Sequence, residues 1–75
     1  MPKRHPVLSS FGQNVRKRRE AQKLTQENLA EKSGLHPTYI SGVERGVRNP
    51  SMLVVARTAK ALGISVSELT RGING

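Results

Sequence analysis

The stretch from Thr25 to Pro50, TQENLAEKSGLHPTYISGVERGVRNP, predicts two short helices joined by a tight turn. Thr25 belongs to the residue types that cap helix starts. The residues after it recur at the spacing of one buried helix face: Leu29, Ala30 and Ser33. Gly34 permits the left-handed backbone of a tight turn, so the first helix is expected to end there.

The second helix of this stretch is expected to begin at a proline. Pro37 is acceptable only near a helix start, so the helix should run from about Pro37 to Arg45, where Gly46 ends it. Ile40 and Val43 then face inward. Two short helices joined by a glycine turn are the layout of a helix-turn-helix. In that motif the first helix braces against the sugar-phosphate backbone of DNA and the second presents its outer face to a major groove.

Three further helices are expected around this pair. Ser10 and Gln13 have the spacing of a capping box, so the chain's first helix should begin after Ser10. Ser51 can cap a fourth helix, and Gly63 ends it. The residues expected on the buried face of that helix are Met52, Val55, Ala56, Ala59 and Leu62. Ser65 and Glu68 form a second capping box for a short last helix.

These signals predict an all-α fold, a compact five-helix bundle. No stretch alternates between apolar and polar residues for long, so no sheet is expected. We expect a flexible N-terminal arm over residues 1–7, one domain over residues 8–71 and a short tail over residues 72–75.

Charge narrows the class of partner. The chain has 75 residues with thirteen Lys and Arg against five Glu and no Asp, a net charge of +8, which favours polyanions. Nucleic acid and an anionic membrane surface both qualify, but no apolar run approaches the roughly 20 residues that span a bilayer. The N-terminal MPKRHPV lacks the apolar segment of a secretory signal, and the chain has no cysteine. We therefore expect a cytoplasmic protein.

No constellation for catalysis or for a cofactor is evident. His5 is expected in the arm, and His36 at a helix start where an imidazole nitrogen accepts a hydrogen bond. Neither has the carboxylate or cysteine neighbours of a metal site. The sequence also lacks a carboxylate pair, an activated nucleophile and a phosphate-binding glycine loop. We expect no enzyme activity, metal, cofactor or small-molecule ligand.

Many of these residues together resemble the Xre/Cro repressor family. The resemblance covers about residues 8 to 70. It rests on Phe11-Gly12, Val15-Arg16, Arg19, Leu24-Thr25-Gln26-Glu27, Leu29-Ala30, Ser33-Gly34-Leu35, Pro50-Ser51 and Ala61-Leu62. The run from Thr38 to Arg45, followed by Arg48 and Asn49, is most similar to the controller proteins of restriction-modification systems. The resemblance implies a lambda-repressor-like domain that binds a two-fold symmetric double-stranded DNA operator as a homodimer.

The resemblance also implies roles for individual residues. Gln26 falls where family members hold a phosphate, and Thr38 and Ser41 fall at base-facing positions. Pro37 occupies another such position but offers only apolar contact, and Gly42 has no side chain. Specificity is therefore expected to depend less on paired hydrogen bonds from the helix itself than on Arg48, Asn49, thymine methyl groups and operator shape. Arg48 and Asn49 lie in the loop after the recognition helix.

Several other positions have competing interpretations. Tyr39 is either a core residue or, as we favour, a rim residue touching DNA backbone or a partner. Glu44 is expected to pair with Arg19 or with Arg48. Thr58 replaces a large aliphatic residue of the family, and either under-fills the core or bonds back to the previous helical turn.

The remaining cations are not equivalent. The run from Arg16 to Arg19 spans every side of a helical turn, so its members cannot all contact one DNA molecule. Arg45, at the end of the recognition helix, is better placed for DNA contact. Lys3 and Arg4 are candidates for a groove-binding arm.

Surplus apolar residues predict the dimer interface. Leu53 and Val54 stand where polar residues are common in the family, and a chain this small cannot bury every apolar residue alone. The residues expected at the interface are Leu53, Val54, Ile64, Val66 and Leu69.

Two other functions compete with transcriptional control. An antitoxin would need an added tail long enough to wrap its toxin, and only six residues follow Leu69. RNA binding fits the charge, but two aromatic residues supply little stacking surface.

Overall fold

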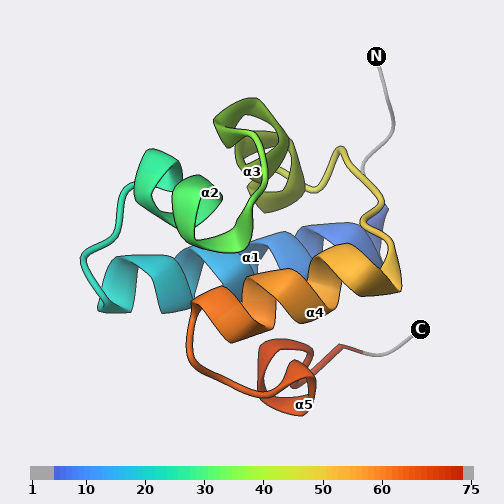
Figure 1. Cartoon of the computed structure of the whole chain (residues 1–75). Coiled ribbons are helices and arrows are strands. Elements are labelled where there is room, and N and C mark those ends of the chain that lie inside the picture. The colour runs from blue at the N-terminus through green and yellow to red at the C-terminus, as the bar shows by residue number, and fades with distance from the viewer. Residues whose placement is uncertain (1–4, 74–75) are drawn as a thin grey trace.

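A computed structural model describes residues 5–73 of the chain, which form five α-helices and no strand over that range. The helices are α1 (Pro6–Ala21), α2 (Gln26–Ser33), α3 (Pro37–Glu44), α4 (Met52–Ala61) and α5 (Val66–Leu69). Figure 1 shows α2 and α3 together on one side of α1, with α5 on the opposite side, below α4. The predicted all-α, five-helix fold is confirmed.

Most helix starts are the predicted ones. The Thr25 hydroxyl accepts a hydrogen bond from the Asn28 amide, and the Asn28 side chain accepts one from the Thr25 amide, which completes a capping box before α2. Ser51 caps α4, and Ser65 and Glu68 form the predicted box before α5. Because each box satisfies two free amides, these short helices begin at defined residues.

The predicted start of the first helix is wrong. Helix α1 begins at Pro6 and not after Ser10, because His5 Nδ1 accepts a hydrogen bond from the Val7 amide at 3.2 Å and caps the helix. Proline is well suited to the first helical position, where no amide hydrogen is needed. Ser10 and Gln13 therefore lie inside α1, and residues 6 and 7 belong to the helix and not to an arm.

One core joins the helices. Helix α1 packs against α3 and α5, while α2 packs against α3 and α4. The buried apolar side chains are Phe11, Val15, Leu29, Ala30, Ile40, Val43, Val55, Ala59, Leu62 and Leu69. Burying each of the larger ones contributes about 1.5 to 3 kcal/mol of transfer free energy. This core fixes α2 and α3 as one unit on top of α1 and α4.

Helix α4 is turned differently from the prediction. Met52 is 74% exposed and Ala56 is also exposed, so neither belongs to the buried face, which contains Val55, Ala59 and a buried Thr58. The Thr58 hydroxyl donates to the Val54 carbonyl oxygen at 2.8 Å. Of the two interpretations of Thr58, the bond back to the previous turn is the observed one.

The C-terminal segment is attached to α1. The Asn14 side chain donates to the carbonyl oxygens of Leu69 and Arg71, and Ile73 packs on the core although residues 72–75 were expected to be a tail. Leu69 is 0% exposed, so it is a core residue with no surface to offer a partner, contrary to its predicted place in a dimer interface. Over residues 5–73, every helix is too short or too polar to cross a membrane.

Candidate nucleic-acid interface

The inner side of α3 rests directly on α1. Ile40 and Val43 are buried, as predicted, and Gly12 of α1 lies against the end of α3. A methyl group at Gly12 would collide with the carbonyl oxygens of Val43 and Glu44. The absence of a side chain at Gly12 therefore lets the two backbones approach closely.

A buried ion pair fixes the end of α3. Arg19 Nε donates to Glu44 Oε2 at 2.6 Å and Arg19 Nη2 donates to Oε1 at 3.0 Å, a two-pronged pair whose side chains are 11% and 4% exposed. Arg19 Nη1 also donates to the Leu24 carbonyl oxygen. The hydrogen bond to Glu44 raises the pKa of Arg19 above its usual value, although partial burial opposes the shift. Of the two predicted partners of Glu44, Arg19 is the observed one.

The same carboxylate holds the first residue of α2. Gln26 Nε2 donates to Glu44 Oε1 at 3.1 Å, so one carboxylate connects α1, α2 and α3. A side-chain amide nitrogen carries two hydrogens. One hydrogen of Gln26 is therefore held by Glu44 while the other remains available to a phosphate oxygen. Sequence reasoning did not foresee this bond, which depends on how the helices meet.

The outer side of α3 carries short polar groups. Thr38 is exposed and Ser41 is half-buried, and both belong to the side of α3 opposite Ile40 and Val43. His36 caps this helix by accepting a hydrogen bond from the Thr38 amide at Nδ1, 3.1 Å away, as predicted for a helix-start histidine. Helix α3 therefore starts at a defined residue, with Thr38 in its first turn.

Two other predicted DNA-contacting residues lie beside this surface. Tyr39 is half-buried and packs against the core, so it is neither a fully buried core residue nor a residue of the surface alone. Asn49 is exposed in the connection between α3 and α4, where it borders a recess with His5, Val7 and Leu8 of the α1 start.

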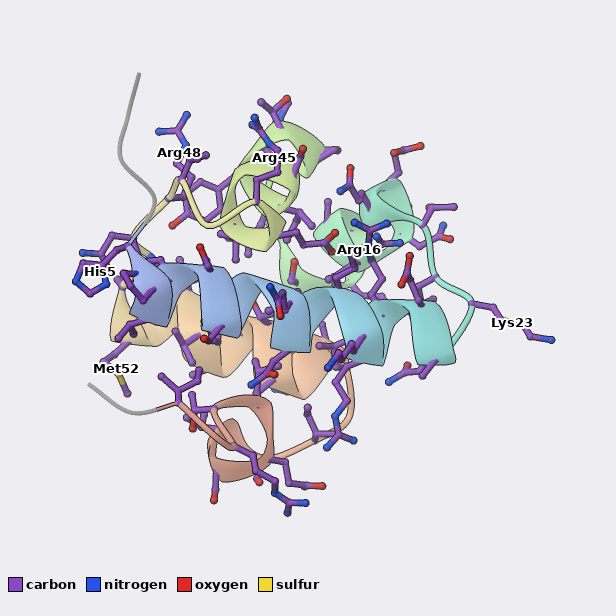
Figure 2. The ribbon with its side chains drawn as sticks, turned by 180° about the vertical axis from the view of Figure 1, so that it is seen from behind. His5, Arg16, Lys23, Arg45, Arg48 and Met52 are labelled. Atoms are coloured by element: carbon purple, nitrogen blue, oxygen red, sulfur yellow. The ribbon has the colours of Figure 1, made fainter. Side chains whose placement is uncertain are left out.

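Arginines surround the end of α3. Figure 2 shows Arg45 and Arg48 projecting on the α3 side of the molecule. Both are exposed, and neither forms an ion pair with a carboxylate within residues 5–73. Arg45 Nε donates to the Ser41 carbonyl oxygen at 3.4 Å. Arg45 and Arg48 therefore place two exposed positive charges beside the end of α3.

The cationic run of α1 is divided among three directions. Arg16 borders a recess with Arg45 on the α3 side, and Arg19 turns inward to Glu44. Lys17 and Arg18 border a different recess, together with residues of the C-terminal segment. The run therefore cannot act as one patch. Lys3 and Arg4, the candidates for a groove-binding arm, lie outside the described residues.

The described side chains offer no evident metal site. Within residues 5–73, no group of three or more His, Cys, Asp or Glu side chains lies close enough together to hold an ion.

Comparisons with known proteins assign the family. A family model described as "Helix-turn-helix" matches residues 15–69. The control protein C.SmaI of Serratia marcescens is 51% identical over 63 residues, which cover 84% of this chain and 75% of that protein. The control protein C.BamHI of Bacillus amyloliquefaciens is 45% identical over 60 residues, which cover 79% of this chain and 74% of that protein.

A solved structure supports the same assignment. The restriction-modification controller protein C.AhdI from Aeromonas hydrophila superposes with a TM-score of 0.85 at 46% identity, covering 87% of this chain and 98% of that one. The matched region contains the turn between α2 and α3, the Arg19–Glu44 pair and the whole outer side of α3. The chain therefore belongs to the helix-turn-helix family of DNA-binding transcriptional regulators, and within it is similar to restriction-modification controller proteins.

Proposed function

We propose that this protein binds a two-fold symmetric double-stranded DNA operator as a homodimer and controls transcription in a restriction-modification system. The observation that carries the proposal is the orientation of α3. Its apolar side is held against α1 by the core and by the Arg19–Glu44 pair, so its polar side faces away from the protein. The similarity to named control proteins supports the regulatory part of the proposal. Because the ligand is DNA, the cytoplasm is the proposed place of action.

The proposed contacts divide into two kinds. Thr38, Ser41, Arg48 and Asn49 meet base edges, because they lie on or directly after the outer side of α3. Gln26, Arg45 and Tyr39 meet the sugar-phosphate backbone. Gln26 lies at the first position of α2, where the helix dipole also favours a phosphate.

The proposed dimer uses the start of α4. Met52 and Leu53 are 74% and 62% exposed, the two large apolar side chains of residues 5–73 that remain in water. Figure 2 shows Met52 projecting away from the side that carries Arg45 and Arg48. Val54, Ile64 and Val66 are half-buried, so part of each residue remains available to the proposed interface. A two-fold pair formed there would leave both α3 helices free for one face of DNA.

Selection of bound sequences from a random DNA pool tests the contacts with bases. The wild type is expected to select a palindrome with half-sites about 10 base pairs apart, one turn of DNA. Thr38→Ala with Ser41→Ala is expected to relax that motif, since each good base contact contributes about 1 to 3 kcal/mol of discrimination. Ser67→Ala, an exposed serine on α5, is the matched control. An unchanged motif in the double variant would refute the orientation of α3.

Binding at several salt concentrations tests the contacts with phosphates. Arg45→Ala should lower the salt dependence by about 0.9 in log–log slope, since one fewer phosphate is neutralised. Gln26→Ala should weaken all sequences alike without changing the slope, because Gln26 carries no charge.

Sedimentation tests the dimer. Leu53→Glu is expected to give monomers at micromolar concentration, because a charge in an apolar interface is left without a partner. Ala21→Glu adds the same charge at an exposed position on the end of α1, which Figure 1 shows at the opposite end of the molecule from the α4 start. A monomeric wild type, or a dimeric Leu53→Glu variant, would contradict the proposed interface.

A further inference from the structure

Gly42 is buried in the middle of α3 although it lies on the polar side of that helix. The group that covers it is the stem of Arg48. A methyl group at Gly42 would lie 2.6 Å from Cγ of Arg48, 3.4 Å from its Nε and 3.5 Å from its Cδ. The contact therefore joins a recognition-helix position that has no side chain to a long side chain from the following loop.

The backbone after α3 brings Arg48 back onto the helix. The Gly46 amide donates to the Val43 carbonyl oxygen and the Val47 amide donates to the Gly42 carbonyl oxygen, both at 3.0 Å. Gly46 has a φ of +77°, which completes a Schellman motif and reverses the chain. Residue 48 follows directly, so its side chain lies across the last turn of α3.

The position that Arg48 covers belongs to the DNA-facing side of α3. Gly42 is four residues after Thr38, and residues four apart share one face of a helix. The guanidinium remains exposed and forms no ion pair with a carboxylate within residues 5–73. Its flat pair of donors matches the O6 and N7 acceptors of guanine, which short side chains such as those of Thr38 and Ser41 cannot span in the same way.

We propose that Gly42 is a positioning residue. Because it has no side chain, the Arg48 stem packs directly against α3 at this position, and the Arg48 guanidinium is thereby placed to bind a guanine in each half-site. This inference rests on the proposed function, in which α3 faces the major groove. A glycine in the middle of a helix is otherwise unfavourable compared with alanine. Packing of the Arg48 stem against Gly42 explains why a glycine stands at this position, where alanine would give a more stable helix.

The test compares Gly42→Ala, Arg48→Ala and the double variant. The three atoms nearest to a methyl group at Gly42 all belong to the exposed Arg48 side chain, and alanine favours a helix more than glycine does, so Gly42→Ala should displace the Arg48 stem and change the Tm little. It should nevertheless lose about 5- to 150-fold of the preference for guanine at one operator position per half-site, the same position that Arg48→Ala affects. The double variant should lose no more than Arg48→Ala alone.

Gly34→Ala is the control with the opposite pattern. Gly34 has a φ of +72° and open space around it, so alanine there should lower the Tm and leave the base preference unchanged. A Gly42→Ala variant with the full guanine preference would overturn the inference, as would losses that add in the double variant. If Arg48→Ala changes nothing but Thr38→Ala with Ser41→Ala relaxes the motif, this inference and the proposed base contact of Arg48 fail, while operator binding through α3 stands. If neither changes the motif, the proposed function fails as well.

Discussion

The two sides of α3 are built on different principles. The inner side packs on the core, approaches the α1 backbone closely at Gly12 and is fixed by the buried Arg19–Glu44 pair. The outer side has two short polar groups, Thr38 and Ser41, and a glycine covered by a side chain from the following loop.

In the proposed function, this difference separates the residues that orient α3 from the residues that recognise DNA. The inner contacts are close and involve backbone or buried charge, so they tolerate little change. The outer side chains are the exposed Thr38, the half-buried Ser41 and the Arg48 stem, and we expect them to contribute little to folding. A regulator built this way can change its operator by substitution on one side of α3 while the other side keeps the helix in place. The following predictions test that separation, in order of decreasing effect on stability.

Removing the carboxylate of Glu44 should have the largest effect. Glu44→Ala leaves the largely buried Arg19 guanidinium without its carboxylate partner, with only the hydrogen bond to the Leu24 carbonyl oxygen remaining, and is expected to cost about 3 kcal/mol in the free energy of unfolding, measured by urea denaturation. Glu20→Ala is the matched control, since it breaks the exposed Arg16–Glu20 pair of α1 and should cost no more than about 0.5 kcal/mol. Equal losses for the two variants would show that the inner side is not held by its buried pair.

Gly12→Ala should have the next largest effect. The added methyl group overlaps the backbone oxygens of Val43 and Glu44, which cannot move without shifting α3 against α1, so we expect a loss of about 1 to 3 kcal/mol. The same substitution at Gly42 meets the exposed Arg48 side chain and should change stability little. Thermal unfolding of both variants compares the two sides of α3 directly, and a loss of the same size at Gly42 would remove the distinction.

Local signals in the sequence predicted most of the fold. Thr25, Ser51, Ser65 and Gly34 mark helix ends because a hydroxyl cap or a left-handed backbone acts over only a few residues. The start of α1 was missed because Ser10 and Gln13 also fit a capping box, while His5 is a less common cap that acts here with Pro6.

The site was less predictable because it depends on contacts between distant residues. The sequence indicated that Glu44 pairs with a cation, but the choice of Arg19 depends on how α1 crosses α3. The bond from Gln26 to Glu44 and the contact of Arg48 with Gly42 have the same origin. The one feature of the sequence that points to the contact between Gly42 and Arg48 is the glycine itself, because glycine is unfavourable inside a helix.

The outer side of α3 should contribute almost nothing to stability. Thr38→Ala with Ser41→Ala is expected to change the free energy of unfolding by less than about 0.5 kcal/mol, because the side-chain oxygens form no hydrogen bond within residues 5–73. Urea denaturation of the same double variant that is used for operator selection supplies the measurement. A loss of 2 kcal/mol or more, on the order of a core substitution, would mean that recognition and folding share these residues.

The smallest effect concerns α5, which lies on the opposite side of the molecule from α3 (Figure 1). Hydrogen bonds from the Ser65 amide and hydroxyl to the Glu68 carboxylate hold the pKa of Glu68 below its usual value. The unfolded chain therefore binds this proton more readily than the folded one. The resulting stabilisation is fully present above the ordinary glutamate value of 4.5 and is lost as the pH falls through the lowered folded value.

Glu68→Gln isolates this contribution, because glutamine keeps the capping-box acceptor but does not titrate. The wild type should be more stable than Glu68→Gln at pH 7, and the difference in Tm should vanish in acid, where the wild-type carboxyl is protonated. All other carboxylates are common to both proteins and cancel in the difference. Operator binding at pH 7 should be the same for both, since the cap lies away from both sides of α3. A Tm difference that stays constant from pH 7 to pH 3 would show that the Glu68 charge does not stabilise the fold.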